Sequence, residues 1–142
     1  RLIVQLVRCL DSAAVVDLPR GGRVMVVVAG LGAAVGALGR YGLTRLVQSL
    51  YGNQWPLATL LINWLGCLIL GLITGWHWDQ TTMVLVGTGV LGGFTTYSTF
   101  SHELVMLADQ RRYLAMLGYL SASVIGGLLL AFGGFSLGMV IR

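Results

Sequence analysis

Charged side chains are scarce in this sequence, and lysine is absent. Only 10% of the 142 residues are charged, and all nine basic residues are arginine. A soluble domain carries roughly 25% charged residues, so this chain has too few to cover a water-facing surface. The arginines are scattered, and no basic stripe alternates with aromatic residues, which argues against a nucleic-acid-binding surface. We therefore expect the outer surface to face lipid.

Residues that carry enzyme or metal chemistry are also few. The two cysteines, Cys9 and Cys67, indicate neither a disulfide framework nor a metal site. The two histidines, His77 and His102, lack the spacing of metal ligands. No nucleophile–base pair, phosphate-binding loop or pair of carboxylates is evident. We therefore expect no enzyme activity.

Long apolar runs dominate the chain instead. Hydrophobic residues make up 56% of the sequence, and the mean hydropathy is +0.84. A membrane-spanning helix needs about 20 mostly apolar residues, and four segments qualify: 24–47, 56–76, 81–107 and 113–141. Short connections separate them, and tryptophans flank the second, as is typical of a membrane–water interface. The sequence predicts an all-α membrane protein with four transmembrane helices.

The first 23 residues differ from the rest. They begin with Arg1, contain two aspartates and a proline, and their one apolar run, 2–10, is too short to span a bilayer. We expect residues 1–23 to be an N-terminal extension, either disordered or lying at the interface as an amphipathic helix, with Met25 as the functional start. Residues 24–142 are expected to form one four-helix transmembrane domain.

Glycine is abundant, with 21 residues, and several glycines are four apart. Small residues at this spacing let helix backbones approach closely in lipid, so we interpret most of these pairs as packing positions. Four short helices with tight loops cannot enclose much of a pore alone, so we also expect an oligomer. The spaced pairs are Gly32 and Gly36, Gly71 and Gly75, Gly89 and Gly93, and Gly134 and Gly138.

Arginine is spread almost evenly between the two expected sides of the membrane. The side with both termini carries Arg1, Arg8, Arg20, Arg23 and Arg142, and the other carries Arg40, Arg45, Arg111 and Arg112. Because a bias in Lys and Arg sets orientation, a chain with five against four can insert both ways, which predicts an antiparallel, dual-topology dimer. If translation begins at Met25, the tally becomes one against four and the argument is weaker.

The third segment is the least ordinary. Residues 87–101 read GTGVLGGFTTYSTFS, in which paired glycines precede a run of hydroxyl and aromatic side chains. Glycine and threonine weaken a helix, so one interpretation is a helix broken mid-membrane, which is tolerated only where it is buried in protein or lines a wet cavity. The other is a continuous helix whose hydroxyls bond back to their own turn.

Several polar and aromatic side chains inside the segments are candidates for a site. Asn63 either joins helices or donates hydrogen bonds to an anion, and Thr59 lies on the same helical face. Tyr97 and Phe100 share a face if helix resumes there, and their rings either pack or turn positive edges toward an anion. Ser123 offers a hydroxyl in the fourth segment.

Glu103 is the only acidic residue within a predicted span. Intramembrane acids are functional candidates by default, but Glu103 lies near a helix end, where it could reach the interface or pair with Arg40. Ser121 is an alternative to Ser123 as the hydroxyl of the fourth segment, since helical phase alone does not decide between them.

Three stretches resemble motifs of the Fluc/CrcB family of fluoride channels. Residues 92–100, GGFTTYSTF, resemble the family's third-helix motif, which is long and specific. Residues 39–41, GRY, resemble the end of its first helix, and residues 59–66, TLLINWLG, resemble its second-helix motif. The resemblance covers residues 24–142 in order and spacing.

The resemblance implies a fluoride-selective channel that exports fluoride passively across the bacterial inner membrane and relieves its toxicity. It implies an antiparallel homodimer with two pores, and a structural sodium ion held at the dimer axis by the carbonyls of Gly92 and Thr95. Asn63 would donate to fluoride in the pore. The remaining implied roles belong to Tyr97 and Phe100 as pore rings, Thr59 and Ser123 as a polar track, Arg40 at the vestibule, and Glu103 as support for the third helix.

One residue departs from the family pattern. The first ring of the pair is usually phenylalanine, whereas here it is Tyr97, whose hydroxyl needs a partner. That hydroxyl either adds a donor to the path or turns the ring away from it.

Two other functions fit four short helices. A small multidrug transporter would need an acidic residue in the first segment, which has none. A non-transporting membrane scaffold would need no polar track and would tolerate replacement of Asn63.

Overall fold

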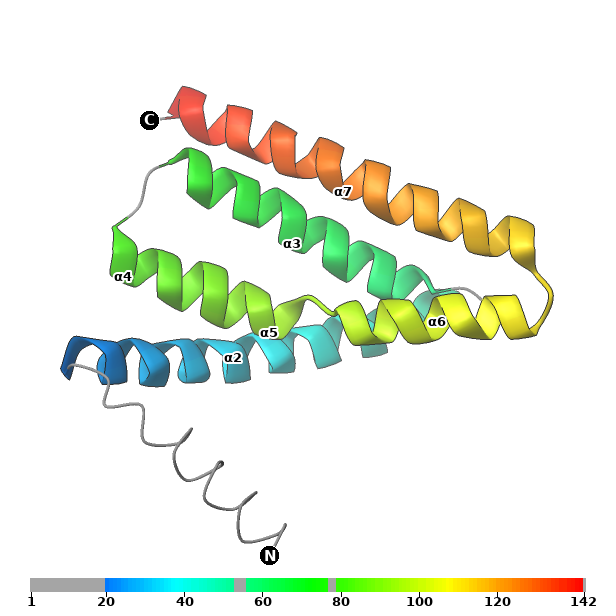
Figure 1. The fold of residues 1–142 in the computed structure, drawn as a ribbon, viewed down its shortest axis with the longest axis horizontal. Coiled ribbons are helices and arrows are strands. Elements are labelled where there is room, and N and C mark those ends of the chain that lie inside the picture. The colour runs from blue at the N-terminus through cyan, green and yellow to red at the C-terminus, as the bar shows by residue number, and fades with distance from the viewer. Residues whose placement is uncertain (1–19, 53–55, 77–78, 142) are drawn as a thin grey trace, which may run out of the picture.

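The regular structure of the described residues is entirely helical. The computed structural model describes residues 20–52, 56–76 and 79–141, so most of the predicted N-terminal extension lies outside it. Within these ranges there is no strand (Figure 1). The long helices are α2 (Arg20–Tyr51), α3 (Leu57–Gly75) and α7 (Tyr113–Ile141), which correspond to the first, second and fourth predicted segments.

All three long helices have the length and composition of membrane spans. They are Val24–Tyr51, Leu57–Gly75 and Tyr113–Ile141, with mean hydropathies of 1.7, 2.1 and 2.2. Each exceeds or nearly reaches the length that crosses a bilayer. The predicted all-helical architecture is thus confirmed, and three of the four predicted segments have the length and composition of membrane spans.

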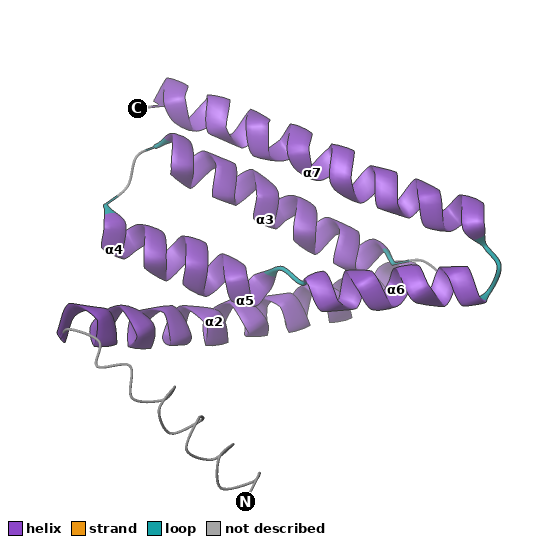
Figure 2. Cartoon of the chain, viewed as in Figure 1, coloured by secondary structure: helices purple, strands orange, loops and turns teal. Residues whose placement is uncertain are grey.

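The third predicted segment is built from several shorter helices. It consists of α4 (Gln80–Thr82), the π-helix η1 (Met83–Leu91), α5 (Gly92–Phe94) and α6 (Tyr97–Asp109). Thr95 and Thr96, between α5 and α6, have extended backbone torsions, with ψ of 161° and 121°. Figure 2 shows this stretch as a short loop within a row of helices.

Asp79 begins this row of helices. The Thr82 hydroxyl donates to its carboxylate at 2.6 Å, and the Thr82 N–H donates to the other oxygen at 3.1 Å. These bonds, chiefly that of the Thr82 side chain, lower the pKa of Asp79 below its ordinary value. The stability that these two hydrogen bonds contribute is therefore present at pH values above the ordinary pKa of an aspartate. It is lost as the pH falls through the lowered pKa of Asp79.

Close backbone contact joins α2 to η1 and α5. A Cβ atom at Gly36 would collide with the carbonyl of Val90 and the amide of Phe94, and one at Gly93 would collide with the carbonyl of Ala33. Only glycine allows the two backbones to approach this closely. This contact brings the part of α2 that carries Arg40 alongside the extended residues.

The pair α3 and α7 is packed by the same device. A Cβ at Gly71 would meet the carbonyl of Ala131, and one at Gly134 would meet the carbonyl of Leu68. All four spaced glycine pairs face a neighbouring helix in this way, so their interpretation as packing positions is confirmed. Figure 1 shows α3 and α7 lying side by side.

Few large side chains are buried within the chain. Tyr119 is fully buried and packs with Leu60 and Leu107, which are each 6% exposed. Large apolar side chains along α2 and α7 are exposed instead, such as Leu38 at 72% and Leu128 at 68%. Apolar surface of this extent favours lipid or another protein chain as its neighbour.

Candidate functional site

Asn63 satisfies the backbone where the third segment is extended. The Thr96 N–H donates to Asn63 Oδ1 at 2.9 Å, and Asn63 Nδ2 donates to the Thr96 carbonyl at 3.1 Å. Thr96 is buried, and a buried N–H or carbonyl left unpaired costs about 1–3 kcal/mol, so this pair of bonds stabilises the extended backbone. Asn63 therefore joins α3 to the third segment, which is one of the two roles that the sequence left open for it. An amide has two N–H donors, and no described residue accepts the second.

Thr96 then starts α6. Its side chain accepts a hydrogen bond from the Thr99 N–H at 3.2 Å, which is the geometry of a helix N-cap. The hydroxyls of Ser98 and Thr99 lie 3.3 Å and 3.0 Å from that of Thr96. The cap fixes the direction in which α6 leaves the extended stretch, and with it the positions of the two rings in the first turn of the helix.

Those rings, Tyr97 and Phe100, lie next to each other beside Asn63. Their centroids are 6.2 Å apart at an angle of 43°, and Phe100 also packs on Tyr119 at 5.3 Å. Tyr97 is 81% exposed. Asn63, Thr96 and both rings line an open hollow of about 430 Å³, and none of its described lining residues is charged.

Glu103 lies at the centre of a hydroxyl network between α3, α6 and α7. Thr59 donates to one carboxylate oxygen at 2.8 Å, and Tyr119 donates to the other at 2.7 Å. Thr59 and Tyr119 are both buried. The Ser123 hydroxyl, one turn beyond Tyr119 in α7, is buried and has no hydrogen-bond partner among the described residues.

Arg40 reaches the extended stretch from α2. Its guanidinium Nη1 lies 3.5 Å from the Thr95 carbonyl, a long hydrogen bond. The pairing of Arg40 with Glu103, which the sequence left open, is not what the structure shows, because the carboxylate accepts from two hydroxyls instead. Both residues nevertheless line a second hollow, of about 340 Å³, together with Thr59, Thr96 and other polar residues.

The carbonyls of Gly92 and Thr95 lie at the end of α5. In a continuous helix the Thr96 N–H would donate to the Gly92 carbonyl, but it donates to Asn63 instead. The Gly92 carbonyl thus lacks its intrahelical donor, and Gly92 is exposed, with open space where a Cβ atom would lie. Both carbonyls are oxygen ligands of the kind that hard cations prefer.

The structure brings most of the predicted residues together around the extended stretch. Asn63, Gly92, Thr95, Tyr97 and Phe100 border the first hollow, and Arg40, Thr59 and Glu103 border the second. Thr96 lines both hollows. Ser123 lines neither.

Sequence reasoning missed Tyr119 and Thr96. Tyr119 lies four residues before Ser123, on the same helical face, and a tyrosine far from the ends of an apolar helix needs a partner for its hydroxyl. That combination was a usable signal. Thr96 and Thr99, three apart after a pair of glycines, carry the spacing of an N-cap.

These features define a class: a multi-pass helical membrane protein in which polar side chains gather around a short extended stretch between α5 and α6. A family model described as CrcB-like protein, Camphor Resistance (CrcB), matches residues 27–135. The chain belongs to this family, as its resemblance indicated.

The chain covers almost the whole length of several curated relatives. The fluoride-specific ion channel FluC 2 of Rhodococcus jostii is 47% identical over 112 residues, which are 79% of this chain and 96% of that protein. FluC 1 of Lactiplantibacillus plantarum is 44% identical over 113 residues, 78% of this chain and 96% of the relative. FluC of Chloroflexus aurantiacus is 41% identical, over 76% and 90% of the two chains. Their name describes ion channels, in agreement with the expectation that this chain is not an enzyme.

The bond from Tyr119 to Glu103 is expected to stabilise the fold. Tyr119→Phe keeps the buried ring but removes the hydroxyl, so it should lower the free energy of unfolding by about 1.5–3 kcal/mol, the range for a hydrogen bond to a charged group. The measurement is unfolding by sodium dodecyl sulfate in mixed micelles, followed by tryptophan fluorescence. Tyr113→Phe, on the exposed first residue of the same helix, is the control, and equal stability of the two variants would contradict this role.

Proposed function

We propose that this chain is a fluoride-selective channel that lets fluoride leave a bacterial cell passively across the inner membrane. One observation carries the proposal: Asn63 is held rigidly against the extended backbone, with one N–H left to donate, beside two aromatic rings and without a fixed charge. The name of the relatives supports the same anion.

The proposed path leads from the hollow beside Arg40 past Asn63 and along Tyr97 and Phe100. Fluoride is small and strongly hydrated, so a pore must replace its water with hydrogen-bond donors. The second N–H of Asn63 is one donor, and the positive edges of the rings provide weaker contacts. The hydroxyls of Thr59 and Ser123 are proposed to continue the polar track, in which Ser123 can donate its O–H, since that of Thr59 is donated to Glu103.

Absence of charge in the hollow that Asn63 lines suits conduction. A bound anion must leave as readily as it enters, so weak, multiple sites conduct better than one strong site. Arg40 lies in the neighbouring hollow, where its charge can attract the anion without holding it against the rings. Glu103, engaged by two hydroxyls, supports α6 and does not act as a ligand.

Tyr97 distinguishes this pore from the pattern with two phenylalanines. Its ring is 81% exposed and extends from the first turn of α6 beside the hollow that Asn63 lines. We propose that it lines the path as the phenylalanine would, and that its hydroxyl adds a hydrogen-bond donor there.

We further propose that two copies assemble antiparallel to complete two pores, with the extended stretch at mid-membrane depth. The hollow beside Tyr97 is open on one side in a single chain, and large apolar side chains remain exposed on α2 and α7. The nearly even distribution of arginine is consistent with insertion in both directions.

The Gly92 and Thr95 carbonyls are the proposed ligands of a structural sodium ion between the two copies. The Gly92 carbonyl lacks its intrahelical donor and Gly92 is exposed, which fits a hard cation, and two copies would supply four oxygens from Gly92 and Thr95. The bound ion would balance carbonyls that the extended stretch leaves without intrahelical donors. The long contact of Arg40 with Thr95 is compatible with this role only if the guanidinium moves aside, since the two cations repel each other.

Fluoride efflux from liposomes tests the function. The purified protein should release fluoride rapidly and retain chloride, and Asn63→Ala should slow fluoride release about 10-fold or more, because a lost hydrogen bond to a charged group corresponds to about 1.5–3 kcal/mol. Phe100→Ile should slow it as well, whereas Phe132→Ile, on the exposed face of α7, should not. No fluoride release from folded protein would exclude the channel.

Cysteine labelling tests the antiparallel arrangement. In a chain with Cys9 and Cys67 replaced by alanine, Gln110→Cys places one thiol in the turn before α7, where the side chain is exposed. An impermeant thiol reagent should label it to a similar extent in right-side-out and inside-out membrane vesicles. Labelling in only one kind of vesicle would show a single orientation.

Exchange of sodium tests the proposed ion. Replacing Na⁺ with a large organic cation at constant ionic strength should make the dimer dissociate more readily in detergent, because a ligand at 100 times its Kd stabilises by about 2.7 kcal/mol. The measurement is size-exclusion chromatography across a protein dilution series. Identical dissociation in the two salts would remove sodium from the assembly.

A further inference from the structure

An open hollow lies at the turn that joins α6 to α7, and we call it the turn hollow. It has a volume of about 360 Å³, and its described lining residues are Arg111, Arg112, Tyr113, Leu114 and Ala115. The turn follows the third predicted span and comes directly before the fourth, which places it where the membrane meets water. The turn hollow therefore combines two positive charges with apolar side chains at the level of the lipid headgroups.

Neither guanidinium of the turn hollow has a partner within the described chain. Arg111 and Arg112 are both exposed, and among the residues that the structure describes neither side chain forms a hydrogen bond or an ion pair. Asp109, two residues before Arg111, is exposed as well, but it does not line the turn hollow. The described lining contains no acidic residue, so an anion there would meet two positive charges directly.

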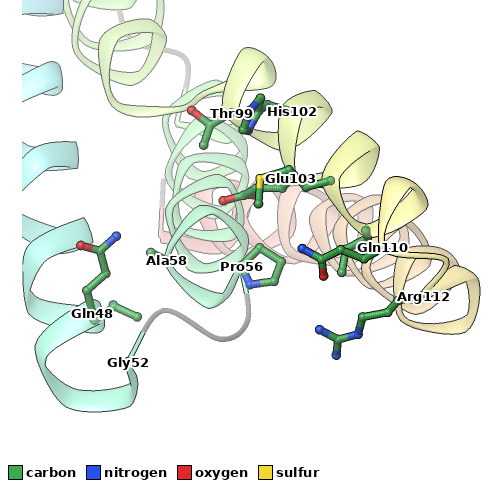
Figure 3. Close-up of a pocket in the computed structure, with 12 residues that line it drawn as sticks. Gln48, Gly52, Pro56, Ala58, Thr99, His102, Glu103, Gln110 and Arg112 are labelled. Atoms are coloured by element: carbon green, nitrogen blue, oxygen red, sulfur yellow. The ribbon is translucent and has the colours of Figure 1, made fainter.

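The other carboxylate near this turn is engaged elsewhere. A recess of about 280 Å³, which adjoins the hollow that holds Arg40, is lined by both Glu103 and Arg112. In the view of Figure 3, Gln110 lies between Arg112 and Glu103. The two oxygens of Glu103 accept hydrogen bonds from hydroxyl groups and not from the arginine. The guanidinium of Arg112 therefore remains available to the turn hollow.

The backbone at Arg111 indicates that its side chain has a use. Its φ is 57°, and it is the only non-glycine residue of the described chain with a positive φ. The turn is closed by the N–H of Arg111, which donates to the Ala108 carbonyl at 2.9 Å. Glycine or asparagine adopts such a φ at lower cost than arginine. A costly conformation that persists at an exposed, charged residue points to a binding role for that residue.

The first turn of α7 supplies an apolar wall beside the two arginines. Leu114 is 88% exposed, and Leu117, three residues further along the same helical face, is exposed as well. The ring of Tyr113 is also exposed and has the mixed polar and apolar character typical of the membrane interface. A charged group followed by exposed apolar side chains suits a ligand with an anionic head and a hydrocarbon tail.

We propose that the turn hollow binds an anionic phospholipid, with Arg111 and Arg112 donating to its phosphate and an acyl chain lying along Leu114. The planar fork of a guanidinium fits two oxygens of a phosphate group. An anionic lipid such as phosphatidylglycerol has a net negative headgroup, whereas the phosphate of phosphatidylcholine is offset by the lipid's own cation. The site should therefore select the anionic lipid. This binding takes place on the lipid-facing side of each chain and does not rest on the conduction of fluoride.

Native mass spectrometry of the full chain, released from a neutral detergent, counts the bound lipids. The probes are phosphatidylglycerol and phosphatidylcholine with identical acyl chains, each titrated against the purified protein. One phosphatidylglycerol per chain should bind about ten-fold or more tightly than phosphatidylcholine, because each arginine near a membrane surface contributes about five-fold to the binding of an anionic lipid.

Three variants test the two arginines. Arg111→Asn removes one guanidinium but keeps a residue that tolerates a positive φ, and Arg112→Gln removes the other. Each should weaken the binding of phosphatidylglycerol about five-fold, and the double variant about 25-fold. Arg45→Gln is the matched control, because Arg45 is exposed on α2, lies 6.0 Å from the centroid of the Tyr41 ring and does not line the turn hollow. It should bind the lipid as the parent does.

Competition separates a lipid from a free phosphate. Inorganic phosphate and glycerol phosphate, added in large excess, should leave phosphatidylglycerol bound, because they lack the acyl chain that lies along Leu114. Displacement of the lipid by either compound would identify a soluble phosphate as the ligand and overturn the lipid site.

Other outcomes would overturn the proposal as well. Equal binding of the two lipids, parent-like binding by the double variant, or an equal loss in Arg45→Gln would show that no site exists at the turn. Elution of Arg111→Asn as a monomer in size-exclusion chromatography, where the parent elutes as a dimer, would assign this surface to a second copy of the chain. If Arg112→Gln does not fold, Arg111→Asn decides the result alone, since asparagine suits the backbone of the turn.

Discussion

The extended backbone at Thr95 and Thr96 is the constraint on which the rest of the site depends. The Thr95 N–H still donates to the Leu91 carbonyl at 2.9 Å, but the extended residues leave other backbone groups in need of partners, and a buried backbone group left unpaired would cost about 1–3 kcal/mol. Asn63 takes both groups of Thr96, and Arg40 reaches the carbonyl of Thr95. The polar residues around the interruption are therefore required by the backbone before any ligand is considered.

Glycine contacts bring these partners within reach. The backbones of α2 and the third segment touch at Gly36 and Gly93, a few residues before Arg40 and Thr95, so the guanidinium can meet the carbonyl. On the other side, a Cβ at Gly66 would collide with the Thr95 side chain. Gly66 lies less than one turn after Asn63, so the absence of a side chain there lets the third segment approach the amide. Larger residues at these positions would separate the partners that the extended backbone needs.

The sequence predicted the spans and the glycine packing because both depend on local composition and spacing. It also identified Asn63, but not its partner, because Thr96 is 33 residues away and the rotation of each helix about its axis is set by packing. The partner of Glu103 was left open for the same reason. The N-cap at Thr96 orients α6 so that the carboxylate faces Thr59 and Tyr119, whereas Arg40 extends to the backbone. Tyr119 was missed because the partner of its hydroxyl, Glu103, lies on another helix, and the packing of α6 against α7 brings the two together.

The placement of charge explains how such a site could pass an anion without trapping it. The described lining of the hollow beside Asn63 and the rings carries no charge, while the hollow beside Arg40 and the recess beyond it contain the cationic side chains. A full positive charge against the rings would hold an anion strongly and slow its release, whereas the same charge one hollow away raises the local concentration without adding a deep binding site. Because one N–H of the Asn63 amide already donates to the backbone, its remaining N–H gives the anion a single directed hydrogen bond. That combination of distant charge and one fixed donor favours rapid exchange over tight binding.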